Sequence, residues 1–373
     1  MKIRLFPTRN KILIFDQKTG TTFFKIFDSK FVTSLAVRKE EVFFSMLVKS
    51  VFEKLFILRT EKLKIIYFKN IVNYVEPILC VTNQDILSSF YSIQQYCKKT
   101  VFFSFQQGLR DKQTAELNNV HGNYVCFNSS YKKMLKKRFP HANILCGGSI
   151  KANFYIKKQL HKKQLAVVSN ITSLPITKNI FKSFCFGEIV FSSNYFVQSV
   201  LKKLIRKKKI RLKIISRSFR ETNLKDKSII LRAERKYYSN IYGNNIEICT
   251  IDPYQACLEC DLIVSDNSTL GYEAFGMGCK VFFAHVTSYF MREPSYKFGW
   301  PGRLANRGPF WCNEPDKQYM ENRICTLYNM PFSQWKKLSK PYQEKIMVHN
   351  FGNHKIVDDL KTSIPDLEKY CKN

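Results

Sequence analysis

The sequence is poor in acidic residues and has no long apolar run. Asp and Glu total 29 against 61 Lys and Arg, which gives a net charge of +32. Such an excess is typical of an AT-rich coding sequence, and also of proteins attracted to nucleic acid, anionic lipid or acidic glycans. No segment reaches the ~18 apolar residues of a membrane span, and residues 1–15 do not resemble a signal peptide. We therefore expect a cytoplasmic protein, with the anionic inner membrane surface as a candidate partner.

Several catalytic and cofactor motifs are also absent. HExxH, GxSxG, GxxxxGK[ST] and GxGxxG do not occur, and no acidic D-x-D triplet follows an expected strand. The twelve cysteines include one close pair, Cys257 and Cys260, and a lone CxxC is a weak zinc signal. We therefore expect buried thiols, no metal and no cofactor. Charge on a leaving group would then fall to helix N-termini, backbone amides and basic side chains.

The arrangement of apolar segments predicts an α/β protein. The chain has 373 residues, which fits two domains. From about residue 65, short apolar strands alternate with helical stretches, a pattern typical of parallel sheets. The basic stretch 150–163 interrupts the alternation, which then restarts. We predict two Rossmann-like domains facing across a cleft, at 1–155 and 156–330, with helices at 331–373 closing the chain.

A polar break after an apolar strand suggests an anion site. The strand "CDLIVS" at 260–265 runs into Asp266, and a short helix is expected to begin at Ser268 or Thr269. In open parallel sheets, ligands bind at the carboxyl ends of strands, where helix N-termini attract phosphate. Gly271 would let the backbone approach such a ligand. The alternative is an ordinary capped helix with no ligand.

Two further loops follow expected strands of the same kind. Arg217 follows the strand "LKIIS" and is a candidate to pair with phosphate, although a surface arginine in a basic protein is the alternative. Ser149 and Lys151 follow the two glycines at the end of the strand "NILC". We count all three as candidate donor-binding residues.

The first domain supplies candidate acid–base residues. Asp85 and Asp111 are the carboxylates that follow expected strands, and His121 is a rival. Each of the three is more often structural than catalytic. The loop after the strand at 100–105 adds polar candidates for the cleft: Gln107, Gly108 and Arg110.

Several motifs together resemble a known family. "DLIVSDNSTLGYEAFGMGCKVFF" at 261–283, "KFGWPG" at 297–302 and "GPFW" at 308–311 are similar to a bacterial family of surface carbohydrate biosynthesis proteins. "FSFQQGLRD" at 103–111 and "GGSIKAN" at 147–153 add looser similarity. That family looks like GT-B glycosyltransferases, distantly similar to CDP-glycerol glycerophosphotransferases and CMP-sugar transferases.

The resemblance implies that the C-terminal helices pack back across both domains, and that the domains have different roles. The second domain would hold a nucleotide-sugar donor, with a slight preference for CMP, through Ser268, Thr269 and Arg217 at the phosphate and Glu273 at the ribose or sugar. The first domain would hold a glycan or lipid-linked acceptor. The resemblance does not identify the base, and among the three candidates above we favour Asp111. Trp300 and Trp311 would form an aromatic wall of the cleft, unless they belong to a local hydrophobic cluster.

The resemblance thus predicts a metal-independent glycosyltransferase of surface polysaccharide synthesis, including lipopolysaccharide. A nucleotide-sugar epimerase of the same architecture is the first alternative. A non-catalytic basic binding protein is the second, but lysines spread along the whole chain disfavour a nucleic-acid partner. The run "LKKLIRKKKIRLK" at 201–213 is expected to be a solvated helix face or a contact to anionic lipid.

Overall fold

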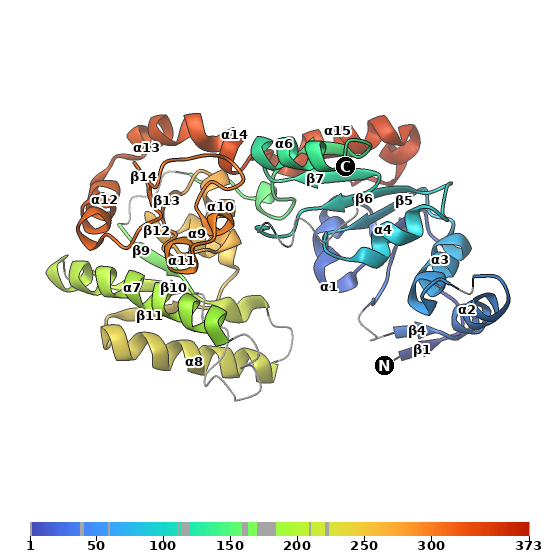
Figure 1. Ribbon diagram of the computed structural model, residues 1–373, viewed down its shortest axis with the longest axis horizontal. Helices are drawn as coiled ribbons and strands as arrows, with labels where there is room; N and C mark the ends of the chain where they lie inside the picture. The colour runs from blue at the N-terminus through green and yellow to red at the C-terminus, as the bar shows by residue number, and fades with distance from the viewer. Residues whose placement is uncertain are drawn as a thin grey trace. The chain divides into compact units, whose positions relative to one another are not determined.

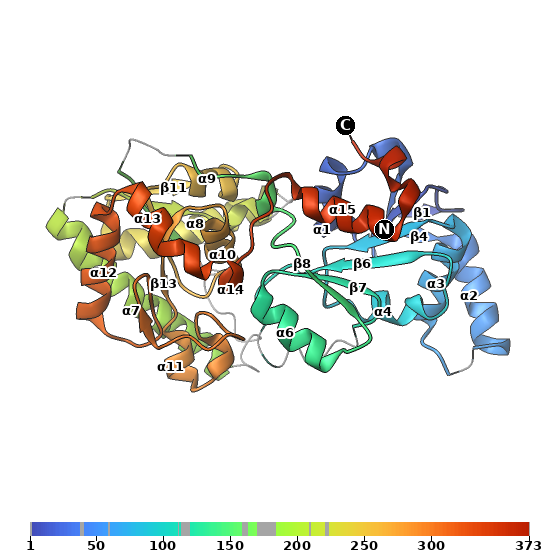
Figure 2. The same ribbon diagram turned by 90° about the horizontal axis from the view of Figure 1, so that it is seen from above.

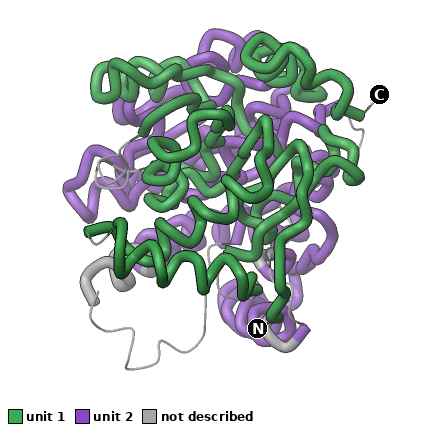
Figure 3. Tube along the Cα trace, turned by 90° about the vertical axis from the view of Figure 1, so that its right-hand side faces the viewer, with its two compact units in different colours: residues 1–151, 350–373 green, residues 152–349 purple. Residues whose placement is uncertain are grey.

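The computed structural model shows two compact α/β units. It describes residues 2–37, 41–58, 60–110, 112, 120–158, 163–169, 184–208, 210–220 and 224–372. The first unit comprises Met1–Lys151 and Asn350–Asn373, and the second comprises Ala152–His349. Figure 3 colours the two units, and Figure 1 labels their elements.

The first unit is built on a six-stranded parallel sheet in the order β3-β2-β5-β6-β7-β8. The central strand β5 is buried along its whole length, because helices lie on both faces of such sheets. The strands and the separate β1–β4 pair are β1 (Lys2–Arg4), β2 (Ile12–Ile14), β3 (Val32–Ser34), β4 (Glu41–Phe43), β5 (Leu79–Thr82), β6 (Val101–Phe105), β7 (Asn123–Cys126) and β8 (Asn143–Cys146). The helices are α1 (Gln17–Gly20), α2 (Phe44–Phe56), α3 (Leu63–Val75), α4 (Ser88–Gln94), α6 (Ser129–Arg138) and α15 (His354–Ser363).

The second unit has a seven-stranded sheet in the order β11-β10-β9-β12-β13-β15-β14. All neighbouring strands are parallel except the pair β14–β15. The strands are β9 (Leu165–Val168), β10 (Leu212–Ile215), β11 (Ile246–Cys249), β12 (Leu262–Ser265), β13 (Lys280–Ala284), β14 (Arg307–Gly308) and β15 (Trp311–Cys312). The helices are α7 (Phe184–Lys208), α8 (Leu224–Tyr242), α9 (Pro253–Leu258), α10 (Thr269–Gly276), α11 (Thr287–Met291), α12 (Lys317–Asn329), α13 (Phe332–Ser339) and α14 (Gln343–Ile346).

Helix starts follow local capping chemistry. Asp252 caps α9 by accepting from the amides of Tyr254 and Gln255 at 3.0 Å each. Helix α6 begins at Ser129, within a pair of serines that could each act as a cap. Asn128, rather than a serine, is its cap, because its Oδ1 accepts from the Tyr131 amide at 2.9 Å.

The C-terminal helices divide between the two units. Helices α13 and α14 belong to the second unit, where Trp335 is buried against Phe275 and Phe310. Residues 350–373 return to the first unit, where the Asn353 amide donates to the Ile150 carbonyl at 3.0 Å. The unit boundaries therefore fall at 151/152 and 349/350, against the 155/156 and 330/331 expected from the sequence.

Candidate functional site

The strand order of the second unit reverses at one point in its sheet. The chain moves outward from β9 to β10 and β11, then returns to the other side of β9 as β12 and β13. Ligands of open α/β sheets bind at such a reversal, outside the carboxyl ends of the strands. Here the point lies between β9 and β12, where Ser169 follows one strand and Asp266 follows the other.

The chain after β12 delivers the N-terminus of α10 to this edge. Asn267 has a φ of 44°, a left-handed conformation that asparagine tolerates, and turns the chain into the helix. Ser268 is the N-cap, yet its side chain makes no capping hydrogen bond. The first amides of α10 are therefore not satisfied by this hydroxyl, and the positive end of the helix dipole lies at the same place.

Asp266 is the most perturbed carboxyl of this edge. Its side chain is buried, and burial raises its pKa to about 7. Its charge also contributes, after burial and Tyr195, to raising the pKa of Tyr237 on α8 to about 12. The sequence placed Asp266 in the loop but gave it no role. A carboxyl that titrates near neutrality can both accept and donate a proton.

Gly271 and Glu273, both in α10, contact neighbouring elements of the second unit. A Cβ on Gly271 would lie 2.1 Å from the Ser265 hydroxyl oxygen, so glycine lets α10 pack against the end of β12. Glu273 is buried, and its Oε1 accepts from the Tyr254 hydroxyl at 3.1 Å. Gly271 therefore serves helix–strand packing, and a contact of Glu273 with ribose or sugar stays a prediction.

A buried polar network occupies the carboxyl end of β10. The Ser216 hydroxyl donates to Glu234 on α8 at 2.5 Å and accepts from the Ser218 amide at 3.0 Å. Glu234 and Ser218 are fully buried. The sequence missed this network, because its members are distant in the chain. Arg217 lies in the same loop, and its side chain is outside the described residues.

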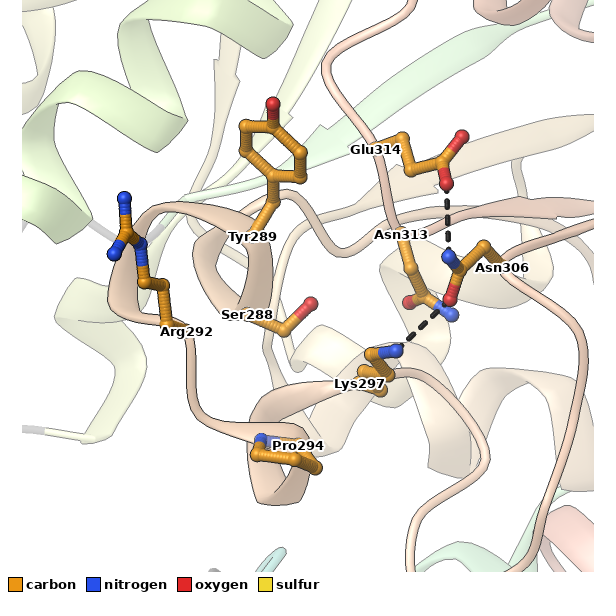
Figure 4. A pocket seen from close by; sticks show the side chains of 8 residues that line it. All are labelled: Ser288, Tyr289, Arg292, Pro294, Lys297, Asn306, Asn313 and Glu314. Carbon is orange, nitrogen blue, oxygen red and sulfur yellow. Dashed lines mark hydrogen bonds between the residues drawn. The ribbon is translucent and has the colours of Figure 1, made fainter.

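A pocket of about 390 Å³ opens beside β13 and β15 in the same unit (Figure 4). Figure 4 shows Ser288, from α11, and Asn313, which follows β15, directed toward each other across it. Asn313 is buried, its oxygen accepts from the Phe298 amide at 2.8 Å, and its amide nitrogen has no partner among the described residues. The remaining lining residues are Tyr289, Arg292, Pro294, Lys297, Asn306 and Glu314.

One wall of this pocket is a chain of charge-assisted hydrogen bonds. Lys297 donates to Asn306 at 2.9 Å, and Asn306 donates to Glu314 at 2.8 Å. The neighbouring Arg307 donates to Glu314 at 2.7 Å, and this bond, together with that from Asn306, lowers the pKa of the Glu314 carboxyl. The wall presents ammonium, amide and carboxylate groups in fixed positions, which suits a ligand rich in hydroxyls.

His285 directly follows β13, at the carboxyl end of that strand. It is buried among Tyr272, Phe283 and Phe298, and burial lowers its pKa to about 4. Its Nδ1 lies 3.3 Å from the Tyr296 carbonyl, while Nε2 has no partner among the described residues. His285 is thus a neutral imidazole at physiological pH, and the sequence offered no signal for it.

In the first unit, Asp85 and Arg110 form a buried ion pair. Arg110 Nε donates to one Asp85 oxygen at 2.9 Å and Nη2 donates to the other. The Tyr124 hydroxyl and the Gln107 amide donate to the same carboxylate at 2.7 and 3.1 Å. Four donors thus occupy the two oxygens of this carboxylate, so the geometry favours an anchoring role for Asp85 over that of a general base. The pair holds the loop that contains Gly108.

The remaining candidate residues of the first unit do not all lie near Asp85. His121 is exposed and precedes β7, so it lies at the amino edge of the parallel sheet, opposite the ends of β5 and β6. The structure thus separates it from Asp85. Asp111 lies outside the described residues. Ser149 is buried and Lys151 half-buried after β8.

The aromatic segment of the second unit forms a core cluster. Trp311 is 3% exposed, packs on Phe298 and Phe310, and donates from its indole nitrogen to the Ala305 carbonyl at 2.9 Å. Trp311 therefore lies in a local hydrophobic cluster with its ring enclosed, which favours that alternative over a wall of a cleft. Trp300 is half-buried.

Two features are absent from the described part of the chain. No cluster of His, Cys, Asp and Glu side chains among them could hold a metal ion. No helix in the described ranges is long and apolar enough to cross a membrane. The predicted metal independence stays a prediction.

Comparisons with known proteins give the family and the fold. The family described as "putative O-antigen biosynthesis protein" matches residues 112–364. A search of curated proteins finds no match to this sequence.

Similar solved structures share the two-unit architecture at low identity. They include a putative UDP-N-acetylglucosamine 2-epimerase from Listeria monocytogenes (11% identity, TM-score 0.52, covering 96% of this chain and 98% of that one). A glycosyltransferase from Rickettsia africae ESF-5 (10%, 0.52, 96% and 100%) and a sucrose-phosphate synthase from Thermosynechococcus elongatus (10%, 0.52, 95% and 99%) are similar to the same extent. These likenesses confirm the predicted fold class of two Rossmann-like units. The chain therefore has a GT-B-like fold and belongs to the O-antigen biosynthesis family, which confirms the resemblance to surface carbohydrate biosynthesis proteins.

Proposed function

We propose that this protein is a glycosyltransferase that moves a sugar from a nucleotide-activated donor to a surface polysaccharide or a lipid-linked acceptor. The observation that carries the proposal is the N-terminus of α10, delivered to the reversal point of the second sheet with a cap residue, Ser268, whose hydroxyl caps no amide. Phosphate is the ligand that such a terminus attracts. Family membership supports a carbohydrate product.

The donor's phosphates would bind at Ser268 and Thr269. Backbone amides and hydroxyls there stabilise the charge that develops on the leaving nucleotide as the glycosidic bond breaks, with no metal required. The nucleotide would extend toward β9 and β10, over Ser169 and Arg217. A CMP-linked donor is preferred, by the resemblance alone.

The pocket beside β13 and β15 would take the transferred sugar. Ser288 and Asn313, which line it, follow β13 and β15, the next two strands after β12 in the sheet, and its volume of about 390 Å³ suits a monosaccharide. The Asn313 amide nitrogen would donate to the sugar. The Ser288 hydroxyl, which donates to the His285 carbonyl at 3.1 Å, would accept from it, and Glu314 and Lys297 would offer charged contacts.

A second candidate is a nucleotide-sugar epimerase, favoured by one observation. Asp266, with its pKa raised by burial to about 7, can exchange a proton with a bound sugar near neutral pH. A transferase has no need of such exchange on the donor side. The acceptor base of a transferase would come from the first unit, where Asp111 remains the candidate.

The test begins with a nucleotide screen. Thermal shifts with CMP, CDP, UDP and GDP should single out one nucleotide, which at 100 times its dissociation constant adds about 2.7 kcal/mol. The corresponding nucleotide-sugar is then incubated in D2O and followed by proton NMR. A transferase leaves the sugar undeuterated and releases the nucleotide slowly in the absence of acceptor. Deuterium in the sugar, lost in Asp266→Asn, would replace the proposal by the epimerase.

A further inference from the structure

Helix α2 of the first unit carries its apolar side chains on the outside. Figures 1 and 2 both show α2 as the outer layer of this unit, beyond α3 and beside the β1–β4 pair. Six large apolar side chains of α2 are between 42% and 63% exposed. Spacings of three and four residues place them on one face: Phe44, Val48, Val51, Phe52, Leu55 and Phe56.

Polar contacts fix this outward orientation. The Asn70 amide of α3 donates to the buried Ser50 hydroxyl of α2 at 3.0 Å. Glu53 pairs with Lys69 of α3 on the same side. A surface helix normally packs its apolar stripe on the core and leaves charge in water. In α2, Ser50 and Glu53 face the protein, so rotation of the helix would bury its exposed rings only by breaking these bonds.

The apolar surface continues beyond the helix. Leu5, which follows β1, accepts a hydrogen bond at its carbonyl from the Ser45 amide of α2 at 3.2 Å. The Leu5 side chain is 61% exposed, and Ile3 and Ile57 are also exposed. Contiguous apolar surface of this kind marks an interaction site in soluble proteins. We call this surface, formed by α2 with Ile3, Leu5 and Ile57, the α2 face.

The charges around the α2 face are positive. Lys2, Lys49, Lys62 and Lys64 are exposed. The three carboxylates at described positions between residues 41 and 64 are engaged, Glu41 with Arg4, Glu53 with Lys69 and Glu61 with the Tyr96 hydroxyl. The α2 face is therefore an apolar surface with a cationic rim, on a chain of net charge +32.

We propose that the α2 face docks on an anionic lipid bilayer, with the phenylalanine and leucine side chains entering the headgroup–acyl boundary. Helices that lie in the membrane interface carry phenylalanine and leucine on one face and lysines beside that face. A second copy of this chain fits less well, because docking two such faces would bring lysine rims of the same sign together. This inference does not rest on the proposed transferase activity.

Vesicle flotation tests the proposal with the full chain. Phe52→Ser/Leu55→Ser alters two exposed side chains and should leave folding intact. Leu224→Ser on α8, 83% exposed in the second unit, is the matched control. Wild type and Leu224→Ser should float with vesicles of phosphatidylethanolamine and phosphatidylglycerol and bind pure phosphatidylcholine less. The double variant should lose at least about tenfold in partitioning.

Three outcomes would overturn the proposal. Wild type that stays monomeric and does not float shows that no bilayer covers the α2 face. Wild type that does not float and self-associates, with the double variant monomeric in sedimentation velocity, assigns the α2 face to a second copy. Flotation that survives Phe52→Ser/Leu55→Ser but is lost in Lys202→Glu/Lys203→Glu assigns lipid binding to α7, where those lysines border a shallow hollow with Ser199.

Discussion

Gly271 in α10 lies directly against Ser265 at the end of β12, so closely that a Cβ at Gly271 would come within 2.1 Å of the serine oxygen and 2.5 Å of its Cβ. This contact sets how near α10 begins to the carboxyl edge of the sheet. It accounts for a glycine three residues after the N-cap without invoking a ligand.

Gly271→Ala should therefore destabilise the second unit. The new methyl group must displace Ser265 or shift α10, which costs about 1–3 kcal/mol. The thermal midpoint should fall, and Ser265→Gly introduced with it should recover most of the loss because it removes both close atoms. A neutral effect of Gly271→Ala alone would contradict this packing.

Removing the charge of Asp85 should destabilise the first unit. In Asp85→Asn the Arg110 guanidinium stays largely buried with no opposite charge, a situation that costs about 3–5 kcal/mol. Urea unfolding of Asp85→Asn, Arg110→Met and the double variant measures the coupling. We expect the double variant to be more stable than the sum of the two single changes predicts, whereas simple additivity would show that the pair is not coupled.

The pH dependence of stability should reveal Asp266. The pKa of its buried carboxyl is raised from 3.8 to about 7, so the folded state favours the protonated form. Its contribution to stability is complete below pH ~4 and is lost as pH rises through 7. Asp266→Asn should accordingly gain stability relative to wild type between pH 5 and pH 8. A difference between the two midpoints that does not change with pH would rule out this ionisation.

His285 gives the opposite slope. Its pKa is lowered to about 4, so its contribution is present above pH 6.5 and is lost as pH falls toward 4. In the background of Asp266→Asn, the thermal midpoint should decline on acidification from pH 6.5 to pH 4.5. Adding His285→Gln should flatten that decline, and an unchanged decline would assign it to another group.

Trp311 should matter for stability and not for ligand binding. Trp311→Phe loses the hydrogen bond to the Ala305 carbonyl and part of a packed ring, at a cost of about 1–3 kcal/mol. Affinity for a nucleotide, measured by calorimetry below the unfolding transition, should remain within about twofold. Loss of affinity with unchanged stability would restore the cleft-wall interpretation.

The two-domain α/β architecture could be predicted from the sequence because strands and helix starts depend on neighbouring residues. Apolar runs such as 262–265 and a cap such as Asp252 predict a strand or a helix start from neighbouring residues alone. The Asp85–Arg110 pair joins residues 25 apart, and the pocket is lined by residues of α11 and of the loops that follow it, up to Glu314. No periodic pattern in the sequence could therefore predict either feature. The outward face of α2 was also hidden, since an apolar stripe predicts burial until the polar contacts of Ser50 and Glu53 are known.

The phosphate site at the N-terminus of α10 is tested most directly by adding one negative charge there. Thr269→Glu and Thr269→Gln are matched in size at the first helical position, where an acidic residue is favourable for the helix itself. Calorimetry with the nucleotide selected by the thermal screen should show affinity close to wild type for Thr269→Gln. Thr269→Glu should bind at least about tenfold more weakly because it repels phosphate. Equal affinity of the two variants would contradict a phosphate site at the N-terminus of α10.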